Sequence, residues 1–409
     1  MRKIFFSLLT MIVFICTFCT RIYAKEDALL VWNELKDETS PGLTETEYTN
    51  KENSLNLTCG GAILIDQNSG NILYEHNMHE KLRPASVTKI MSLLLIMEAV
   101  DSNKISLTDK VPCTEDASKM GGSQIWLDPK EELTVDEMIK AICVVSANDC
   151  VVAMADYLAG SQEAFVEQMN EKAKELGMND TTFKNCHGID EDDHLTSSYD
   201  ISIMSRELLE KHPLIKDYTT IWMDTLRDGK SELVNTNRLI RTYEGATGLK
   251  TGSTSLALYN LSASATRNNL SLIAVVLRAP TPKLRFSEAK LLLDYGFNTY
   301  TFKQLSNKGE YVQNISVSKG TLNNVNLVFE NDSGVILKKS DSNNITQEII
   351  LNDTIEAPIN YGDILGKVNF YNNNYYIKTV NLIAETNIKK KSLINMFEHI
   401  SYNWFNLLR

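Results

Sequence analysis

Three short motifs place residues that together can carry out acyl transfer through a nucleophilic serine. In chain order they are Ser86–Lys89 (S-V-T-K), Ser146–Asn148 (S-A-N) and Lys250–Gly252 (K-T-G). A serine hydroxyl is a weak nucleophile unless a neighbouring base takes its proton. Residues three apart share a helix face, so Lys89 can reach the hydroxyl of Ser86. Burial disfavours the ammonium form of lysine, and a lysine in apolar surroundings can therefore serve as that base.

The residues around the first motif predict a buried helix that starts near the serine. Pro84 suits the first turn of a helix. The positions after Lys89 are apolar nearly all round, which is typical of a helix inside a large core: Ile90, Met91, Leu93, Leu94, Leu95 and Ile96. Ser86 then lies at the start of the helix, where the backbone dipole favours developing negative charge.

Each motif is weak by itself, because an S-x-x-K match is usually an N-cap serine followed by an exposed lysine. The three motifs in this order are specific, since the set is typical of penicillin-binding proteins and class A β-lactamases. From about Gly60 to its C-terminus the chain resembles the low-molecular-mass penicillin-binding proteins, the D-Ala-D-Ala carboxypeptidases of the serine peptidase S11 family. The resemblance is carried by Arg83–Met91, Val145–Asp149, Asn185–Asp190 and Gly248–Thr254.

The resemblance implies a catalytic role for four side chains. Ser86 would attack the carbonyl between two D-alanines and form an acyl-enzyme, and Lys89 would accept the proton of Ser86. Ser146 would relay a proton to the leaving D-alanine, while Asn148 would hold Lys89 and the substrate amide. Backbone N–H groups of Ser86 and Ser253 would stabilise the oxyanion.

The resemblance also implies a substrate-binding strand. Lys250 would supply positive charge near the substrate carboxylate, Thr251 would hydrogen-bond that carboxylate, and Gly252 and Ser253 would complete the binding segment. Arg285 follows Lys250 by 35 positions, where the family has an arginine that meets the terminal carboxylate. The alternative for Arg285 is a surface arginine at the start of a helix.

The chain departs from the family pattern at four places. Ala147 replaces a common glycine, and Cys186 stands where proline is frequent. Ser253 replaces a frequent histidine, and Leu258 stands where glycine is usual. None of these changes removes a catalytic group, but the last two bear on rate and substrate preference.

Composition and charge exclude some partners and cofactors. The 409-residue chain has a net charge of −11, which argues against nucleic acid because phosphate binding needs clustered Lys and Arg. His187 and His194 lack an evident third ligand, so we expect no metal and no other cofactor. The expected partners are peptidoglycan pentapeptide ending in D-Ala-D-Ala, β-lactam antibiotics as covalent inhibitors, and a membrane surface.

The N-terminus predicts export. Arg2 and Lys3 precede the apolar run Ile4–Cys19, and Ala24 fits the residue before a cleavage site, so residues 1–24 are expected to be a signal peptide. The run is 16 residues long, shorter than the roughly 20 that span a bilayer; an uncleaved anchor is the alternative. Five cysteines would remain after cleavage, and one disulfide is possible among them.

Hydrophobic periodicity predicts an α+β fold. Two strand pairs, 62–65 with 72–74 and 258–265 with 270–277, flank a long helical insertion in which a capping box at Thr134–Glu137 opens one helix. This arrangement suggests an antiparallel sheet covered by helices. We expect a polar linker over 25–56, a β-lactamase/transpeptidase-like catalytic domain over 57–299, and a small β-sandwich-like domain over 300–386.

The last segment, 387–409, is predicted to be an amphipathic helix that lies on the membrane outside the cell. Lys389–Lys391 precede apolar residues at helical spacing, with Trp404 among them. The alternative is a terminal helix that packs on its own protein.

Other functions remain open. A β-lactamase shares the nucleophile, but no E-x-x-L-N segment lies between Asn148 and Lys250. A D,D-endopeptidase or transpeptidase uses the same acyl-enzyme. A non-catalytic penicillin or peptidoglycan sensor is disfavoured because Lys89 and Ser146 are both present.

Overall fold

The three-dimensional structure is a computed structural model that describes residues 55–352 and 355–392. The predicted signal peptide over 1–24, nearly all of the predicted linker and most of the predicted terminal helix lie outside these residues.

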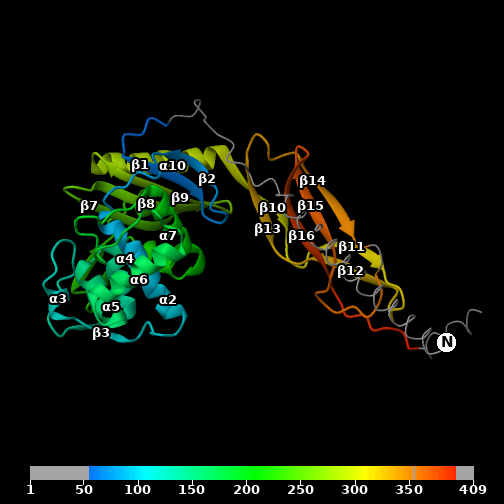
Figure 1. Ribbon diagram of the computed structural model, residues 1–409, viewed down its shortest axis with the longest axis horizontal. Helices are drawn as coiled ribbons and strands as arrows, with labels where there is room; N and C mark the ends of the chain where they lie inside the picture. The colour runs from blue at the N-terminus through cyan, green and yellow to red at the C-terminus, as the bar shows by residue number, and fades with distance from the viewer. Residues whose placement is uncertain (1–54, 353–354, 393–409) are drawn as a thin grey trace, which may run out of the picture. The chain divides into compact units, whose positions relative to one another are not determined.

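A five-stranded antiparallel sheet with the order β2-β1-β9-β8-β7 forms the centre of the catalytic part (Figure 1). The strands are β1 (Gly61–Asp66), β2 (Ile72–His76), β7 (Ala246–Thr254), β8 (Leu258–Arg267) and β9 (Leu270–Ala279). The predicted hairpin β1–β2 and the predicted pair β8–β9 are both confirmed. The third motif lies within β7, at the edge of the sheet.

The long insertion between β2 and β7 is mainly helical, as the periodicity predicted. It contains the 3₁₀ helix η1 (Ala85–Thr88) and the helices α2 (Lys89–Asp101), α3 (Glu115–Ser118), α4 (Val135–Val144), α5 (Asn148–Ala159), α6 (Gln162–Glu175), α7 (Ser198–Lys211), α8 (Ile215–Thr219) and α9 (Leu239–Thr242). Two short hairpins, β3 (Lys110–Pro112) with β4 (Glu132–Thr134) and β5 (Met223–Leu226) with β6 (Ser231–Val234), interrupt it. The expected capping box of α4 is present between Thr134 and Glu137.

Alternation along the strands buries both faces of the central sheet. Ile63 and Ile273 point into the core shared with the helical insertion. Leu64 and Leu272 point into a second core, where α10 (Pro282–Thr299) packs. Successive side chains of a strand face opposite sides, so the same strands serve both cores. The expected antiparallel sheet covered by helices is confirmed.

The C-terminal part is all-β, also as predicted. A two-stranded sheet pairs β10 (Tyr300–Ser306) with β13 (Ser333–Lys338), and a five-stranded sheet has the order β11-β12-β16-β15-β14. The latter contains β11 (Tyr311–Ser316), β12 (Asn324–Phe329), β14 (Ile345–Leu351), β15 (Ile364–Asn372) and β16 (Tyr375–Ala384). The turn between β15 and β16 uses Asn373 and Asn374 with positive φ angles of 49° and 68°, which asparagine tolerates better than most residues.

Residues 387–392 are extended and not helical. Ile388 forms a β-bridge with Ile359, and Lys390 forms one with Gly320. The β-domain therefore continues beyond 386, into the segment that was expected to start the terminal helix; residues 393–409 lie outside the described residues. Within 55–352 and 355–392, no helix is long and apolar enough to cross a membrane.

All five cysteines of the described chain are free and buried: Cys59, Cys113, Cys143, Cys150 and Cys186. No disulfide joins any two of them. Burial raises the pKa of the Cys143 and Cys186 thiols to about 12, so these side chains behave as small apolar groups.

Candidate active site

The chain brings Ser86 to the start of the buried helix by a tight backbone turn. η1 precedes α2, so the predicted helix begins as a 3₁₀ turn, and Ala85 has a φ of +49°. A positive φ is unfavourable for a residue with a β-carbon, and such strain is common where a side chain must be aimed. Ser86 remains half-buried at the surface of the site, whereas Lys89 in the next turn is fully buried.

Lys89 has three oxygen neighbours. Its Nζ lies 3.0 Å from Ser86 Oγ, 2.6 Å from Asn148 Oδ1 and 2.7 Å from the carbonyl oxygen of His187. Burial, together with the nearby charge of Lys250, holds the pKa of Lys89 well below its ordinary value. The environment therefore favours the neutral amine.

A neutral amine has two N–H groups and one lone pair. The Asn148 and His187 carbonyl oxygens can only accept, so both N–H groups are directed to them. The lone pair is then left for the hydroxyl proton of Ser86. This is the geometry that a general base needs to activate a serine.

The second motif reaches Lys89 through Asn148, the first residue of α5. Ser146 has a φ of +66°, and its buried Oγ has no hydrogen-bond partner within the described chain. An unpaired buried hydroxyl costs stability, and a hydroxyl kept free here is available to a bound molecule. The side-chain Nδ2 of Asn148 donates to the carbonyl of Gly121 at 2.7 Å.

The third motif contributes a buried cation from β7. Lys250 is 1% exposed, and its Nζ donates to the carbonyl of Thr251 at 2.9 Å. Burial lowers the pKa of Lys250 to about 7. Thr251 Oγ1 donates to Thr236 Oγ1 at 2.8 Å. The hydroxyl of Thr251 is therefore hydrogen-bonded to Thr236, a residue that the sequence analysis did not single out.

Two glycines enclose the backbone of the nucleophile. A β-carbon on Gly252 would lie 2.9 Å from the carbonyl oxygen of Pro84 and from the backbone nitrogens of Ser86 and Val87. One on Gly188, which has a φ of +88°, would lie 2.0 Å from the carbonyl oxygen of Ala85. Only glycine allows so close an approach. The resemblance had included Gly252 as the last residue of the K-T-G motif, without predicting its close contact with the backbone around Ser86.

Asn260 is a second feature that the sequence analysis missed. It is fully buried on β8, and its Nδ2 donates to the carbonyls of Arg83 and Pro84 at 2.8 and 2.9 Å. Its Oδ1 accepts from the backbone of Arg278. Asn260 therefore fixes the segment that leads into Ser86. The available signal was an asparagine, a residue that is uncommon in strands, inside the predicted strand.

Arg285 lies on α10 but reaches β7. Its Nη1 is 3.3 Å from the carbonyl oxygen of Gly252 and 3.4 Å from that of Asn260, and its Nε has no partner. Arg285 is 8% exposed, so the surface alternative is wrong. Burial, together with the charge of nearby Arg238, lowers the pKa of Arg285 to about 10. Arg238, which the sequence analysis did not name, thus adds positive charge here.

His187 and His194 support the polypeptide around Ser86. The carbonyl of His187 accepts from Lys89, while its Nδ1 accepts from the backbone of Ile189 at 3.2 Å. His194 accepts from the backbone of Lys184 at Nδ1, which leaves Nε2 to donate to Thr88 Oγ1 at 2.8 Å. Among the described residues no group of His, Cys, Asp or Glu is arranged to hold a metal ion.

Two of the departures from the family pattern take defined positions. Leu258, where glycine is usual, has a φ of +56°, so the chain keeps a conformation that favours glycine. Ser253 is exposed at the end of β7, next to Gly252. Neither change displaces the three motifs from one another.

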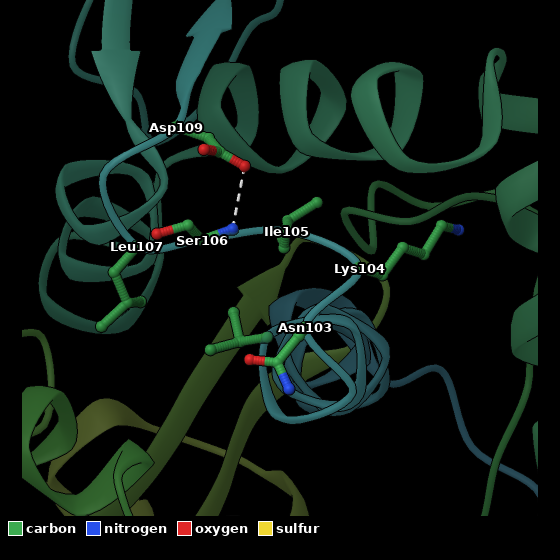
Figure 2. A pocket seen from close by; sticks show the side chains of 7 residues that line it. Asn103, Lys104, Ile105, Ser106, Leu107 and Asp109 are labelled. Atoms are coloured by element: carbon green, nitrogen blue, oxygen red, sulfur yellow. Dashed lines mark hydrogen bonds between the residues drawn. The ribbon is translucent and has the colours of Figure 1, made fainter.

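A surface hollow elsewhere has no part in this arrangement (Figure 2). It has a volume of about 410 Å³ and is lined by Val100, residues 103–107 and Asp109. Its Lys104 donates to the carbonyl of Leu158. The hollow contains none of the motif residues.

A serine beside a buried lysine of lowered pKa, with an unpaired hydroxyl in the motif that contacts this lysine and a buried cation nearby, defines a serine acyl-transfer site. Comparisons with known proteins agree with this class. The family model described as D-alanyl-D-alanine carboxypeptidase matches residues 47–281, and that of the penicillin-binding protein 5 C-terminal domain matches residues 300–390. The chain therefore belongs to the D-alanyl-D-alanine carboxypeptidase family, peptidase S11, as its motifs predicted.

Individual relatives extend over most of the chain. D-alanyl-D-alanine carboxypeptidase DacF of Bacillus subtilis is 43% identical over 84% of this chain and 89% of its own length. The crystal structure of penicillin binding protein 5 from Haemophilus influenzae is 30% identical, with a TM-score of 0.68, over 82% of this chain and 98% of that one. Penicillin-binding protein D2 of Listeria monocytogenes, solved in an ampicillin-bound form, is 31% identical with a TM-score of 0.56, over 60% of this chain and 100% of that one.

The close packing of Gly252 leads to a first prediction. Gly252→Ala should lower the rate of covalent labelling by fluorescent penicillin about 100-fold, because the methyl group separates β7 from Ser86 and misplaces an oxyanion donor. The rate is measured at several penicillin concentrations, and thermal unfolding checks that the variant is folded. Labelling at the native rate by a folded variant would contradict this account of the site.

Proposed function

We propose that this protein removes the terminal D-alanine from peptidoglycan pentapeptide stems through an acyl-enzyme on Ser86. The contact between Ser86 Oγ and the buried Nζ of Lys89 carries the proposal. Membership of the carboxypeptidase family supports the choice of substrate.

In the acylation step, Ser86 Oγ attacks the carbonyl carbon between the two D-alanines, and its proton passes to Lys89. The oxyanion is stabilised by the backbone N–H groups of Ser86 and Ser253. The C–N bond then breaks, and the nitrogen of the leaving D-alanine receives this proton from Lys89 through the hydroxyl of Ser146, which returns Lys89 to its neutral form. Asn148 holds Lys89 and the substrate amide throughout.

In the second step, water attacks the ester carbonyl of the acyl-enzyme. Its proton passes to Lys89, and the ester bond to Ser86 Oγ breaks as this oxygen takes a proton back. The shortened stem leaves with a new carboxylate, and the enzyme returns to its starting state. A β-lactam antibiotic acylates the same serine and becomes a covalent inhibitor.

The terminal carboxylate of the substrate is bound by the positive end of the site. Lys250 and Arg285 supply buried positive charge next to Gly252, and Thr251 turns its hydroxyl from Thr236 to the carboxylate. Arg238 adds further charge. Buried cations attract an anion strongly because little water screens them.

Alternative activities remain possible for the same serine. A D,D-endopeptidase or transpeptidase shares the acyl-enzyme, and a non-catalytic penicillin sensor would be acylated without turnover. A β-lactamase needs rapid deacylation, and the chain lacks the E-x-x-L-N segment that would supply it.

We also propose the division of the chain and its location. Residues 1–24 direct export and are removed, 25–56 form a linker and 57–299 form the catalytic domain, while the β-domain starts at 300 and extends to 392. The segment 393–409 binds the outer face of the cell membrane as an amphipathic helix. Its support is a basic run, Lys389–Lys391, followed by an apolar set at helical spacing: Leu393, Met396, Phe397, Ile400, Trp404, Leu407 and Leu408.

Release of D-alanine tests the activity most directly. The chain from residue 25 should free D-alanine from a pentapeptide ending in D-Ala-D-Ala and should be labelled by fluorescent penicillin. Ser86→Ala should reduce both signals at least about 1000-fold, because the nucleophile is lost. Ser102→Ala, an exposed serine at the end of α2, serves as the control. Equal labelling of native protein and Ser86→Ala would refute the mechanism, and labelling without D-alanine release would favour the sensor.

The lowered pKa of Lys250 predicts a pH dependence of substrate binding. Below about pH 7 Lys250 carries its charge, and above it the free enzyme loses this charge. KM for the pentapeptide should therefore rise by up to about tenfold per pH unit above pH 7. In Lys250→Arg the guanidinium stays charged, so KM should be nearly independent of pH over this range. A native KM that does not change with pH would contradict the assignment.

Membrane binding is tested by flotation with vesicles that contain anionic lipid. The chain 25–409 should float with the vesicles, and a chain that ends at Ser392 should not, because it lacks the apolar helical set. Both keep Lys389–Lys391, so the comparison isolates residues 393–409. If the two chains behave identically, the membrane assignment is wrong.

A further inference from the structure

A loop between α3 and β4 contacts the second motif, and we call its residues Gly121–Leu127 the rim loop. Asn148 holds its first half. The side-chain Nδ2 donates to the carbonyl of Gly121 at 2.7 Å, and the backbone N–H donates to that of Ser123 at 2.7 Å. Asn148 also accepts a hydrogen bond from Lys89. This single residue therefore connects the rim loop to the general base.

Two charged side chains, Asp149 and Arg227, hold the second half of the rim loop in place. The carboxylate of Asp149 accepts from the N–H groups of Ile125 and Leu127, each at 3.1 Å. From the β5–β6 turn, Arg227 donates to the carbonyls of Ile125 and Trp126 at 2.9 and 3.3 Å. Arg227 is itself held by both carboxylate oxygens of Glu131. The peptide groups on both sides of Trp126 are therefore held in place.

Trp126 is unusual for a residue in so rigid a loop. Its side chain is 74% exposed, and its φ is +54°. A bulky residue rarely adopts a positive φ, and an exposed indole gains nothing from burial within the chain. Strained residues that the surroundings hold in place cluster at ligand sites. An exposed, rigid aromatic ring is also what a binding site uses for apolar contact.

We propose that Trp126 forms the subsite for the stem peptide, the part of the substrate that precedes the two D-alanines. The inference rests on the proposed function. The terminal carboxylate lies toward Lys250 and Arg285, while the acyl side of the scissile bond is held by Asn148, which also carries the rim loop. The stem therefore continues toward this loop, where methylene groups of its side chains pack on the indole.

The test compares two substrates that differ only in length. One is an acetylated D-Ala-D-Ala dipeptide, and the other is the full pentapeptide. Trp126→Ala should lower kcat/KM for the pentapeptide about tenfold, mainly through KM, as loss of one aromatic contact implies. Hydrolysis of the dipeptide and labelling by penicillin should change less than about twofold. Trp126→Phe should restore most of the loss.

Two arginines provide a matched pair of variants. Arg227→Gln should reproduce the selective loss, because the indole is no longer held. Arg206→Gln removes a similar clamp, on the carbonyls of Gln67 and Asn68 after β1, and should change neither substrate. Tyr157→Ala, an exposed aromatic side chain of α5, controls for general loss of surface apolar groups.

The possible failures are distinguishable. If Trp126→Ala affects both substrates equally, or neither, the subsite is wrong while the proposed function stands. If the native chain releases D-alanine from neither substrate, the proposed function itself is wrong, and the subsite fails with it.

Discussion

The burial of Lys89 is the constraint on which the rest of this active site depends. An amine that must stay neutral needs an apolar surrounding, yet it also needs acceptors for its N–H groups. The fold meets both needs by enclosing α2 in the core and bringing two carbonyl oxygens to the amine, one from α5 and one from the loop that contains His187. Three segments far apart in the chain must therefore assemble before Ser86 acquires a base.

The central sheet organises the other half of the site. β7 is an edge strand, so only one of its sides pairs with another strand, β8. Its backbone at Gly252 lies against η1. Gly252 permits contact with the backbone of Ser86, and Asn260 on β8 holds the segment just before it. Both contacts act on the backbone around Ser86 and position the nucleophile, whereas its reactivity is set by the side chain of Lys89.

The sequence allowed the motifs and most long elements to be predicted, because these depend on local pattern. The capping box at Thr134 marked α4, and alternation with a turn marked β8 and β9. The short hairpins β3–β4 and β5–β6 were missed, since strands of three or four residues have too little alternation to be distinguished from loop. Asn260, Gly188 and Arg227 were missed for another reason: their roles arise from contacts with distant segments, which a single sequence does not display.

The buried thiols have a consequence for the conditions under which the chain can fold. The five cysteines in the described residues are all unpaired. The native state of these residues therefore requires no oxidant and no disulfide isomerase. Stability comes instead from two large apolar cores, whose formation involves no oxidation step. Formation of the described fold therefore does not depend on an oxidising environment, and the same fold can form with or without oxygen.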